Sequence, residues 1–198
     1  MQLYITTGSP YARIVRVVVL EKGLTDRVEI LQAKTRQTGS PYYDINPSGR
    51  VPYLIRDDGV GLEDSALICA YLDQLDNNPV FAFPADQVWE ARRLEALVRS
   101  MLDGLAVLVR EKRRPLNEQS PTIVLHETDR AKRMLDLWEK EIGQPIFNGP
   151  LNMVQIVMVC ALGFAGLLSD FDWRAGHPKL AKWFDELSKR PSFASTAP

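Results

Sequence analysis

The chain has 198 residues, 45% hydrophobic and 25% charged, which is enough to bury a core in one large domain or two modest ones. Its 24 basic and 25 acidic residues give a formal net charge of −1, which provides no electrostatic basis for binding nucleic acid or an anionic membrane surface. Two histidines and two widely spaced cysteines cannot supply a zinc-type ligand cluster by spacing.

The cysteine pattern and the start of the chain indicate a cytoplasmic location. Cys69 and Cys160 each lie in an apolar stretch, as expected for reduced thiols packed as small hydrophobic groups in a reducing compartment. The N-terminus enters a strand-like run directly, without the features of a signal peptide. Residues 145–169 carry no charge, but their continuous apolar part is shorter than a membrane span, so we expect a buried core helix.

Through Leu75, short strand-like runs alternate with helical ones, as in an α/β unit. Ser9 followed by Pro10 is a helix start signal, because serine caps the first amides and proline suits the first helical position. Gly23 is the corresponding stop signal. The predicted elements, in chain order, are a strand at 2–6, a helix at 10–22, a strand at 28–32, an irregular stretch with a short helical turn at 40–48, a hairpin of strands at 51–56 and 61–63, and a helix at 64–75.

The second half of the chain is helical. Residues 1–76 form the predicted first domain, residues 77–86 a linker rich in turn-forming residues, and residues 87–198 an all-helical domain. The stretch 152–168 is apolar nearly all round, which is typical of the central helix of a bundle. Asn152 and Gln155 have the spacing of an N-terminal capping box.

The order of the first-half elements is the thioredoxin-like layout, with a proline opening the hairpin. Redox members of that fold keep a Cys-x-x-Cys pair at the first strand–helix junction, where this chain has Thr6-Thr7-Gly8-Ser9-Pro10-Tyr11. Thiol–disulfide exchange through a protein cysteine is therefore disfavoured.

Three segments give the chain a specific resemblance. Ser9-Pro10-Tyr11-Ala12-Arg13 resembles the opening of bacterial glutathione transferases. Asn46-Pro47-Ser48-Gly49-Arg50-Val51-Pro52-Tyr53-Leu54 is similar to the family's Asn-Pro-x-Gly-x-Val-Pro-x-Leu segment, and Leu62-Glu63-Asp64-Ser65 to its Leu-x-(Glu/Gln/Asp)-Ser segment. All three have the family's order and separation, and the helical half extends the resemblance over nearly the whole chain.

The resemblance implies that a hydroxyl at the first helix stabilises the thiolate of glutathione. Ser9 is our candidate, because a helix N-terminus favours an anion and a hydroxyl can donate to the sulfur. Thr7, and less strongly Tyr4 or Tyr11, are rival donors, since family members differ in this position. By its residue type alone, Ser9 is better explained as a plain N-cap, and the two other motif segments are what favour the catalytic hydroxyl.

The second segment implies contacts to the backbone of glutathione. In the family the bond preceding this proline is cis, so we expect a cis Val51–Pro52 bond that presents the Val51 amide and carbonyl to the cysteinyl part. A trans proline opening an edge strand is the alternative. Arg50 is a candidate for the glycyl carboxylate, with Lys34 ranked below it, although either is equally explained as a solvated surface charge.

The third segment implies contacts to the γ-glutamyl end of glutathione. Asp64 is expected to accept from the ammonium group, and the Ser65 hydroxyl with the helix amides to hold the carboxylate. Either residue is also a plausible helix cap, and the two roles are compatible.

The function implied by the resemblance is conjugation of reduced glutathione to small hydrophobic electrophiles, with glutathione as co-substrate and without a metal or other cofactor. The family also implies a homodimer. Two alternatives share the same site: a glutathione-binding or chaperone-like module without turnover, because a fold does not fix a function, and a glutathione-dependent peroxidase or reductase.

Overall fold

The computed structural model describes residues 1–81, 83 and 86–198. The chain divides into two compact units, one of Met1–Val80 with Ser195–Pro198 and one of Phe81–Ala194. The predicted linker at 77–86 spans this division, and its residues 82, 84 and 85 lie outside the described part of the chain. Sequence periodicity gives no sign that the last four residues group with the first unit.

The first unit is built on a four-stranded sheet with the strand order β2-β1-β3-β4. Strand β1 pairs parallel with β2 and antiparallel with β3, and β3 pairs antiparallel with β4. Its elements are β1 (Gln2–Ile5), α1 (Pro10–Glu21), β2 (Glu29–Gln32), α2 (Tyr42–Ile45), β3 (Tyr53–Ile55), β4 (Gly61–Glu63) and α3 (Ser65–Gln74). This is the predicted thioredoxin-like layout.

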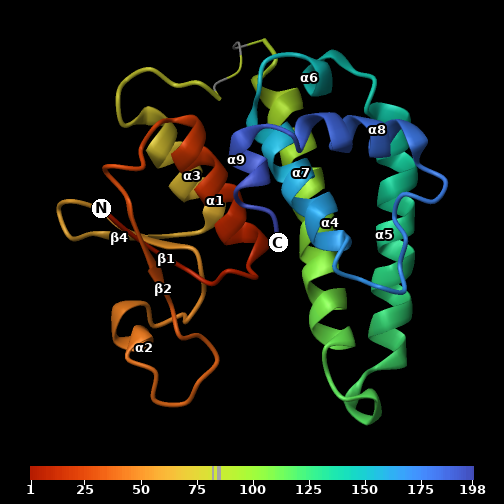
Figure 1. The fold of residues 1–198 in the computed structure, drawn as a ribbon, viewed down its shortest axis with the longest axis horizontal. Coiled ribbons are helices and arrows are strands. Elements are labelled where there is room, and N and C mark those ends of the chain that lie inside the picture. The colour runs from red at the N-terminus through yellow and green to blue at the C-terminus, as the bar shows by residue number, and fades with distance from the viewer. Residues whose placement is uncertain (82, 84–85) are drawn as a thin grey trace. The chain divides into compact units, whose positions relative to one another are not determined.

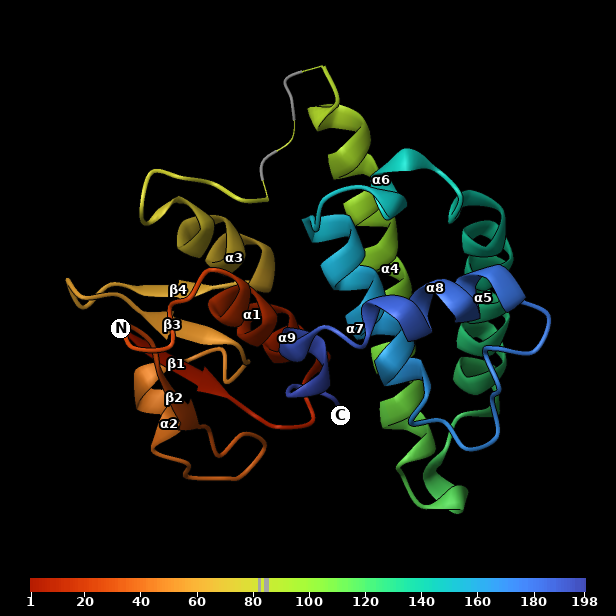
Figure 2. The ribbon, with the colours of Figure 1, turned by 45° about the horizontal axis from the view of Figure 1, so that its top comes forward.

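The two faces of the sheet carry different side chains, because neighbours along a strand point to opposite sides. Leu3 and Leu54 are paired across β1 and β3 and are fully buried. Figures 1 and 2 show α1 and α3 together on one side of the sheet. Tyr4 points to the opposite face, where its ring lies 5.6 Å from the ring of Tyr42 in α2. The predicted helical turn in residues 40–48 is thus the cover of the second face.

Helix α1 begins and ends as its sequence predicts. The Ser9 Oγ accepts a hydrogen bond from the Ala12 N–H at 3.2 Å, and Pro10 occupies the first helical position. After the helix, Gly23 has a φ of +63°, a left-handed conformation that costs glycine little, and the Leu24 N–H donates to the Val19 carbonyl.

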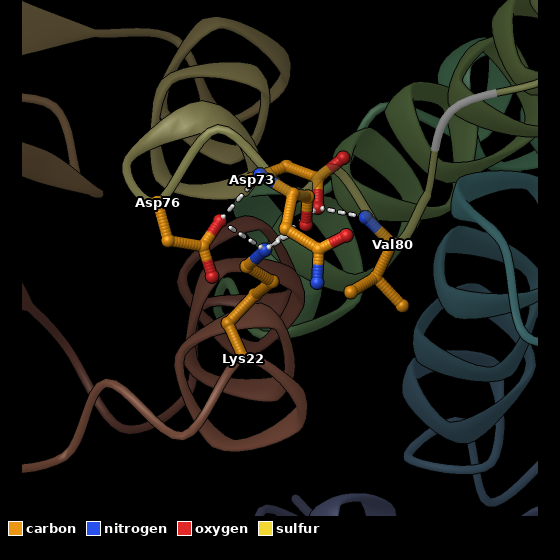
Figure 3. Close-up of polar contacts among 5 residues, drawn as sticks. Lys22, Asp73, Asp76 and Val80 are labelled. Atoms are coloured by element: carbon orange, nitrogen blue, oxygen red, sulfur yellow. Dashed lines mark hydrogen bonds and ion pairs between the residues drawn. The ribbon is translucent and has the colours of Figure 1, made fainter.

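A polar cluster ties the end of α1 to the segment that follows α3 (Figure 3). The Lys22 side chain is 1% exposed, and its Nζ lies 2.9 Å from Asp76 Oδ1 and 3.6 Å from Asp73 Oδ1. The same Nζ donates to the Asn78 carbonyl at 2.7 Å, and Asp73 Oδ1 accepts from the Val80 N–H at 2.8 Å. One buried ammonium group therefore joins the end of α1 to Asp73 in the last turn of α3 and to two points of the segment after it.

We expect Lys22→Met to destabilise the first unit by about 2 kcal/mol, because it removes the buried ammonium group that lies beside the nearly buried Asp73 carboxylate. Chemical denaturation followed by circular dichroism measures this change. Asp76→Asn is the control and should cost less, since Asp76 is about half exposed. The Lys22 hydrogen bond lowers the pKa of Asp76, so the contribution of Asp76 is present at neutral pH and is lost as acid protonates it. A loss no larger for Lys22→Met than for Asp76→Asn would contradict the prediction.

The described part of the second unit consists of helices joined by turns and loops, with no strand. Its elements are α4 (Val88–Lys112), a short 3-10 helix (Leu116–Glu118), α5 (Pro121–Glu141), α6 (Pro145–Asn148), α7 (Met153–Ala165), α8 (Pro178–Leu187) and α9 (Pro191–Ala194). Helix α4 packs against both α5 and α7, and α8 contacts α5 and α7 (Figure 1). The residues of α7 are buried on nearly all sides, as predicted for a central helix.

The predicted capping box at the start of α7 is confirmed. The Gln155 N–H donates to Asn152 Oδ1 at 3.2 Å, and the Asn152 N–H donates to Gln155 Oε1 at 3.0 Å. Within the described residues, no helix is long and apolar enough to cross a bilayer. Cys69 and Cys160 are both buried and are not joined in a disulfide, in agreement with the sequence analysis.

Candidate functional site

The topology of the sheet brings the three motif segments together where β1 ends, β3 begins and β4 ends. We call this place the β1–β3–β4 edge. Residues Tyr4, Tyr53 and Glu63 are successive partners across β1, β3 and β4. Because β3 is antiparallel to both neighbours, the end of β1, the start of β3 and the end of β4 lie on the same side of this row. Neighbouring strands lie about 4.8 Å apart, so the three strand ends span roughly 10 Å.

Ser9 lies beyond the end of β1, where a turn closed by its own N–H and the Thr6 carbonyl leads into α1. It is half-buried and is the N-cap of the helix. Because its oxygen accepts from the Ala12 N–H, its hydroxyl hydrogen stays available for donation. Thr7 lies two residues earlier and is exposed, and Tyr4 packs on Tyr42. Among these hydroxyls, Ser9 is therefore the one that lies at the positive end of the helix.

The bond between Val51 and Pro52 is cis, as the sequence analysis expected. Strand β3 begins after it at Tyr53, two residues later than the predicted start at residue 51. The N–H and C=O of Val51 form no hydrogen bond with any other described residue. An edge with a free amide and a free carbonyl at one residue can pair with the backbone of a peptide ligand.

The backbone of Arg50, the residue before Val51, is held by hydrogen bonds with three neighbouring side chains. The Arg50 carbonyl accepts from the Tyr42 hydroxyl at 2.5 Å and from Asn46 Nδ2 at 3.0 Å, and the Arg50 N–H donates to Ser48 Oγ at 3.2 Å. Burial raises the pKa of the Tyr42 hydroxyl, so it remains protonated and keeps donating. The Arg50 side chain is exposed, so the held backbone carries a cation that faces solvent.

A second set of bonds joins this turn to strand β4. Asn46 is 3% exposed, and its Nδ2 also donates to Glu63 Oε2 at 2.9 Å. The Ser48 hydroxyl donates to the same carboxylate oxygen, and the Ser48 N–H donates to Asn46 Oδ1 at 3.2 Å. The Glu63 carboxylate thus accepts from the first and the middle residue of the loop from Asn46 to Arg50 that precedes Val51.

Asp64 follows β4 and caps α3. Its Oδ1 accepts from the Ala66 N–H at 2.8 Å and from the Leu67 N–H at 3.2 Å. Its φ is +80°, a conformation that costs a non-glycine residue about 1–3 kcal/mol and is concentrated at functional sites. Asp64 is exposed, and its second carboxylate oxygen has no partner among the described residues. This oxygen can accept from a ligand.

The remaining predicted contacts are placed less favourably. Ser65 begins α3 and is 3% exposed, so any ligand contact depends on the small exposed part of this residue. Lys34 is exposed, and its carbonyl accepts from Ser40 Oγ at 2.6 Å. Within the described residues there is no group of histidine, cysteine and carboxylate side chains that could hold a metal ion.

The sequence analysis missed the residues that support the turn. Tyr42 lies in an irregular stretch without periodicity, so nothing local indicates its role. Asn46 was quoted only as part of a motif, and Glu63 occupies a position that the motif leaves open. Only the structure shows that Asn46 is 3% exposed, and a buried amide needs hydrogen-bond partners, so its role could not be recognised before its burial was known.

The chain was compared with known proteins. The model of the glutathione S-transferase N-terminal domain matches residues 8–75, which include the three edge segments, and that of the C-terminal domain matches residues 89–186. A glutathione S-transferase from Methylobacillus flagellatus, solved with glutathione bound, is 31% identical over 100% of this chain and 98% of its own, with a TM-score of 0.89. The chain belongs to the glutathione S-transferase family.

Other relatives share the full length of this glutathione S-transferase family member. A glutathione transferase family member from Pseudomonas fluorescens, solved with bound glutathione, is 30% identical with a TM-score of 0.90, covering 100% of this chain and 98% of that one. The uncharacterized GST-like protein YibF of Escherichia coli is 29% identical over 100% of this chain and 98% of its own length. The predicted architecture, a thioredoxin-like domain followed by an all-helical domain, is confirmed.

Proposed function

We propose that this chain binds reduced glutathione along the β1–β3–β4 edge and stabilises its thiolate for conjugation to small hydrophobic electrophiles. Relatives at about 30% identity over their full length were solved with glutathione bound, which supports the choice of ligand. The proposed reaction uses glutathione as co-substrate and needs no metal or redox cofactor.

The observation that carries the proposal is the match between the edge and an extended tripeptide. Three residues of extended chain are about 10 Å long, the same as the span of the three strand ends. At the centre, the unpaired amide and carbonyl of Val51 provide backbone pairing beside Pro52. Arg50 and Asp64 supply opposite charges for the glycyl carboxylate and the γ-glutamyl ammonium, and Ser65 is the remaining candidate for the γ-glutamyl carboxylate.

Ser9 is the proposed catalytic hydroxyl. An ordinary thiol has a pKa of about 8.5, and lowering it to about 6.5 requires roughly 2.7 kcal/mol of preferential thiolate stabilisation. A hydrogen bond to an anion together with a helix N-terminus is of this magnitude. The Ser9 oxygen is already fixed by the Ala12 amide, so the hydroxyl donates without reorganisation.

Two substitutions separate the proposed ligand contact of Asp64 from its role as the cap of α3. Asp64→Asn retains an N-cap oxygen and tolerates the positive φ, but loses the charge that faces the ammonium. We expect the Kd for reduced glutathione, measured by calorimetry, to rise about tenfold with little change in thermal stability. Asp64→Ala should add a loss of about 1 kcal/mol of stability from the missing cap. An unchanged Kd in Asp64→Asn would refute the contact.

The proposed function is tested by titrating the protein with reduced glutathione and then assaying turnover with several electrophiles. Heat of binding followed by conjugation supports the transferase. Binding without any turnover supports a glutathione-binding module, and reduction of peroxides or mixed disulfides supports the peroxidase or reductase. No heat of interaction at millimolar glutathione contradicts all three.

We further propose that the protein acts in the cytoplasm as a homodimer. The buried thiols of Cys69 and Cys160 and the need for reduced glutathione agree with a reducing compartment. Light scattering after size-exclusion chromatography measures the oligomeric state.

A further inference from the structure

We infer that Glu63 is a positioning residue for the glutathione-binding edge, acting through Asn46 and Ser48 on the Arg50–Val51 turn. The inference rests on the proposed function, because it concerns how the backbone that faces the ligand is held. It adds a carboxylate to the site in a position that the family motif leaves open.

The first step is the geometry of the carboxylate. Glu63 is the last residue of β4 and pairs with Tyr53 of β3, so its backbone is fixed by the sheet. One oxygen, Oε2, accepts from both Asn46 Nδ2 and the Ser48 hydroxyl. Bonds of this kind, to an ionised acceptor, are stronger than bonds between neutral groups.

Asn46 and Ser48, the two donors to Glu63, also bond to the backbone of Arg50. Asn46 Nδ2 also donates to the Arg50 carbonyl, and Ser48 Oγ accepts from the Arg50 N–H. Both polar groups of the Arg50 backbone therefore bond to side chains that Glu63 orients, and the carbonyl also accepts from the Tyr42 hydroxyl. Val51 follows directly, and its own amide and carbonyl have no partner among the described residues. We call the bonds that join Asn46 and Ser48 to the Arg50 backbone the clamp. The orientation of the Val51 peptide groups depends on this clamp.

The third step is why the carboxylate is there. Asn46 is 3% exposed, and its side chain can make all of its hydrogen bonds in one orientation only. Without Glu63, its Nδ2 and the Ser48 hydroxyl lose a shared acceptor, and the loop from Asn46 to Arg50 samples other arrangements. A binding edge that must first be ordered binds its ligand more weakly.

The test compares Glu63→Leu, which removes the acceptor, with Glu63→Gln, which keeps an acceptor oxygen without the charge. Glu63→Leu should raise the Kd and KM for reduced glutathione about tenfold and change kcat less than twofold. Glu63→Gln should stay within about threefold of the unaltered protein. Glu29→Leu, an exposed glutamate on β2 that accepts from Gln2 Nε2, is the control and should leave all three constants unchanged.

Backbone hydrogen exchange of the protein without glutathione gives a second, independent readout. The Arg50 amide should exchange about tenfold faster in Glu63→Leu than in the unaltered protein, and about as slowly in Glu63→Gln. If the unaltered protein binds no glutathione, the proposed function fails, and the exchange rates alone decide whether the clamp exists. Should Glu63→Leu not fold, Glu63→Ala replaces it: it removes the same acceptor, and the same rises in KM and in Arg50 exchange are expected.

Two results would overturn the inference. A folded Glu63→Leu protein with unaltered KM and unaltered Arg50 exchange removes the positioning role. A purely structural role for Glu63 would lower thermal stability without separating KM from kcat.

Discussion

Ser9→Ala is expected to reduce conjugation at pH 7 by about 10- to 100-fold, with the affinity for glutathione nearly unchanged. The reason is that removal of the hydroxyl returns the pKa of the bound thiol toward its ordinary value of about 8.5, so that a smaller fraction is thiolate at neutral pH. The difference should narrow as the pH is raised toward 9, because both proteins then bind the thiolate. A pH profile of kcat measures the effect on turnover. The thiol pKa of bound glutathione is measured by following the thiolate absorption at about 240 nm as the pH is changed.

Three variants distinguish this role from helix capping. Ser9→Ala also removes the bond to the Ala12 N–H, which should cost about 1 kcal/mol of stability. Ser9→Asn restores a cap without a hydroxyl and should recover stability but not activity, whereas Ser9→Thr should recover part of both. Thr7→Ala is the matched hydroxyl deletion. If Thr7→Ala raises the thiol pKa and Ser9→Ala does not, Thr7 is the working hydroxyl.

Gln155→Leu is expected to destabilise the helical unit by about 2–3 kcal/mol. Gln155 is 2% exposed, and its side chain joins the first turn of α7 to the chain before it: Oε1 accepts from the Asn152 N–H, and Nε2 donates to the Phe147 carbonyl at 2.9 Å. Leucine fills a similar volume but leaves the buried Asn152 N–H without that acceptor. The Phe147 carbonyl retains its bond from Trp183 Nε1 at 2.8 Å, which limits the loss.

Denaturation followed by tryptophan fluorescence measures this change, since Trp138 and Trp183 are buried in the same unit. Asn152→Ser keeps a capping oxygen and should cost less than Gln155→Leu. Ser120→Ala removes the exposed cap of α5, a 3.4 Å bond to the Ile123 N–H, and should cost at most about 1 kcal/mol. If the free energy of unfolding of Gln155→Leu lies within about 0.5 kcal/mol of that of the unaltered protein, which is the usual effect of a surface substitution, the prediction is contradicted.

The predicted and observed elements agree where local chemistry decides the conformation. Ser9 and Pro10 start α1, Asp64 starts α3, and Asn152 with Gln155 start α7, each through side chains within three residues of the amides they satisfy. The predicted strand at 51–56 is observed only as Tyr53–Ile55. Val51 and Pro52 are joined by a cis bond and precede the strand, and the Arg50 carbonyl just before them is held by Tyr42 and Asn46, which a window centred on Val51 does not include.

Residue type and neighbours within about one turn decide where helices start and which helix is apolar all round, so both features were predictable from the sequence. The candidate ligand contacts were named from the resemblance of three segments to a family and not from such local rules. Only the tertiary structure decided which of those contacts face a common edge, because that depends on the antiparallel pairing of β3 with β1 and β4. It also decided that Ser65 is buried while Asp64 is exposed, and that Glu63 bonds to Asn46, 17 residues away. Contacts over such separations form only when the chain is folded, so no local pattern encodes them.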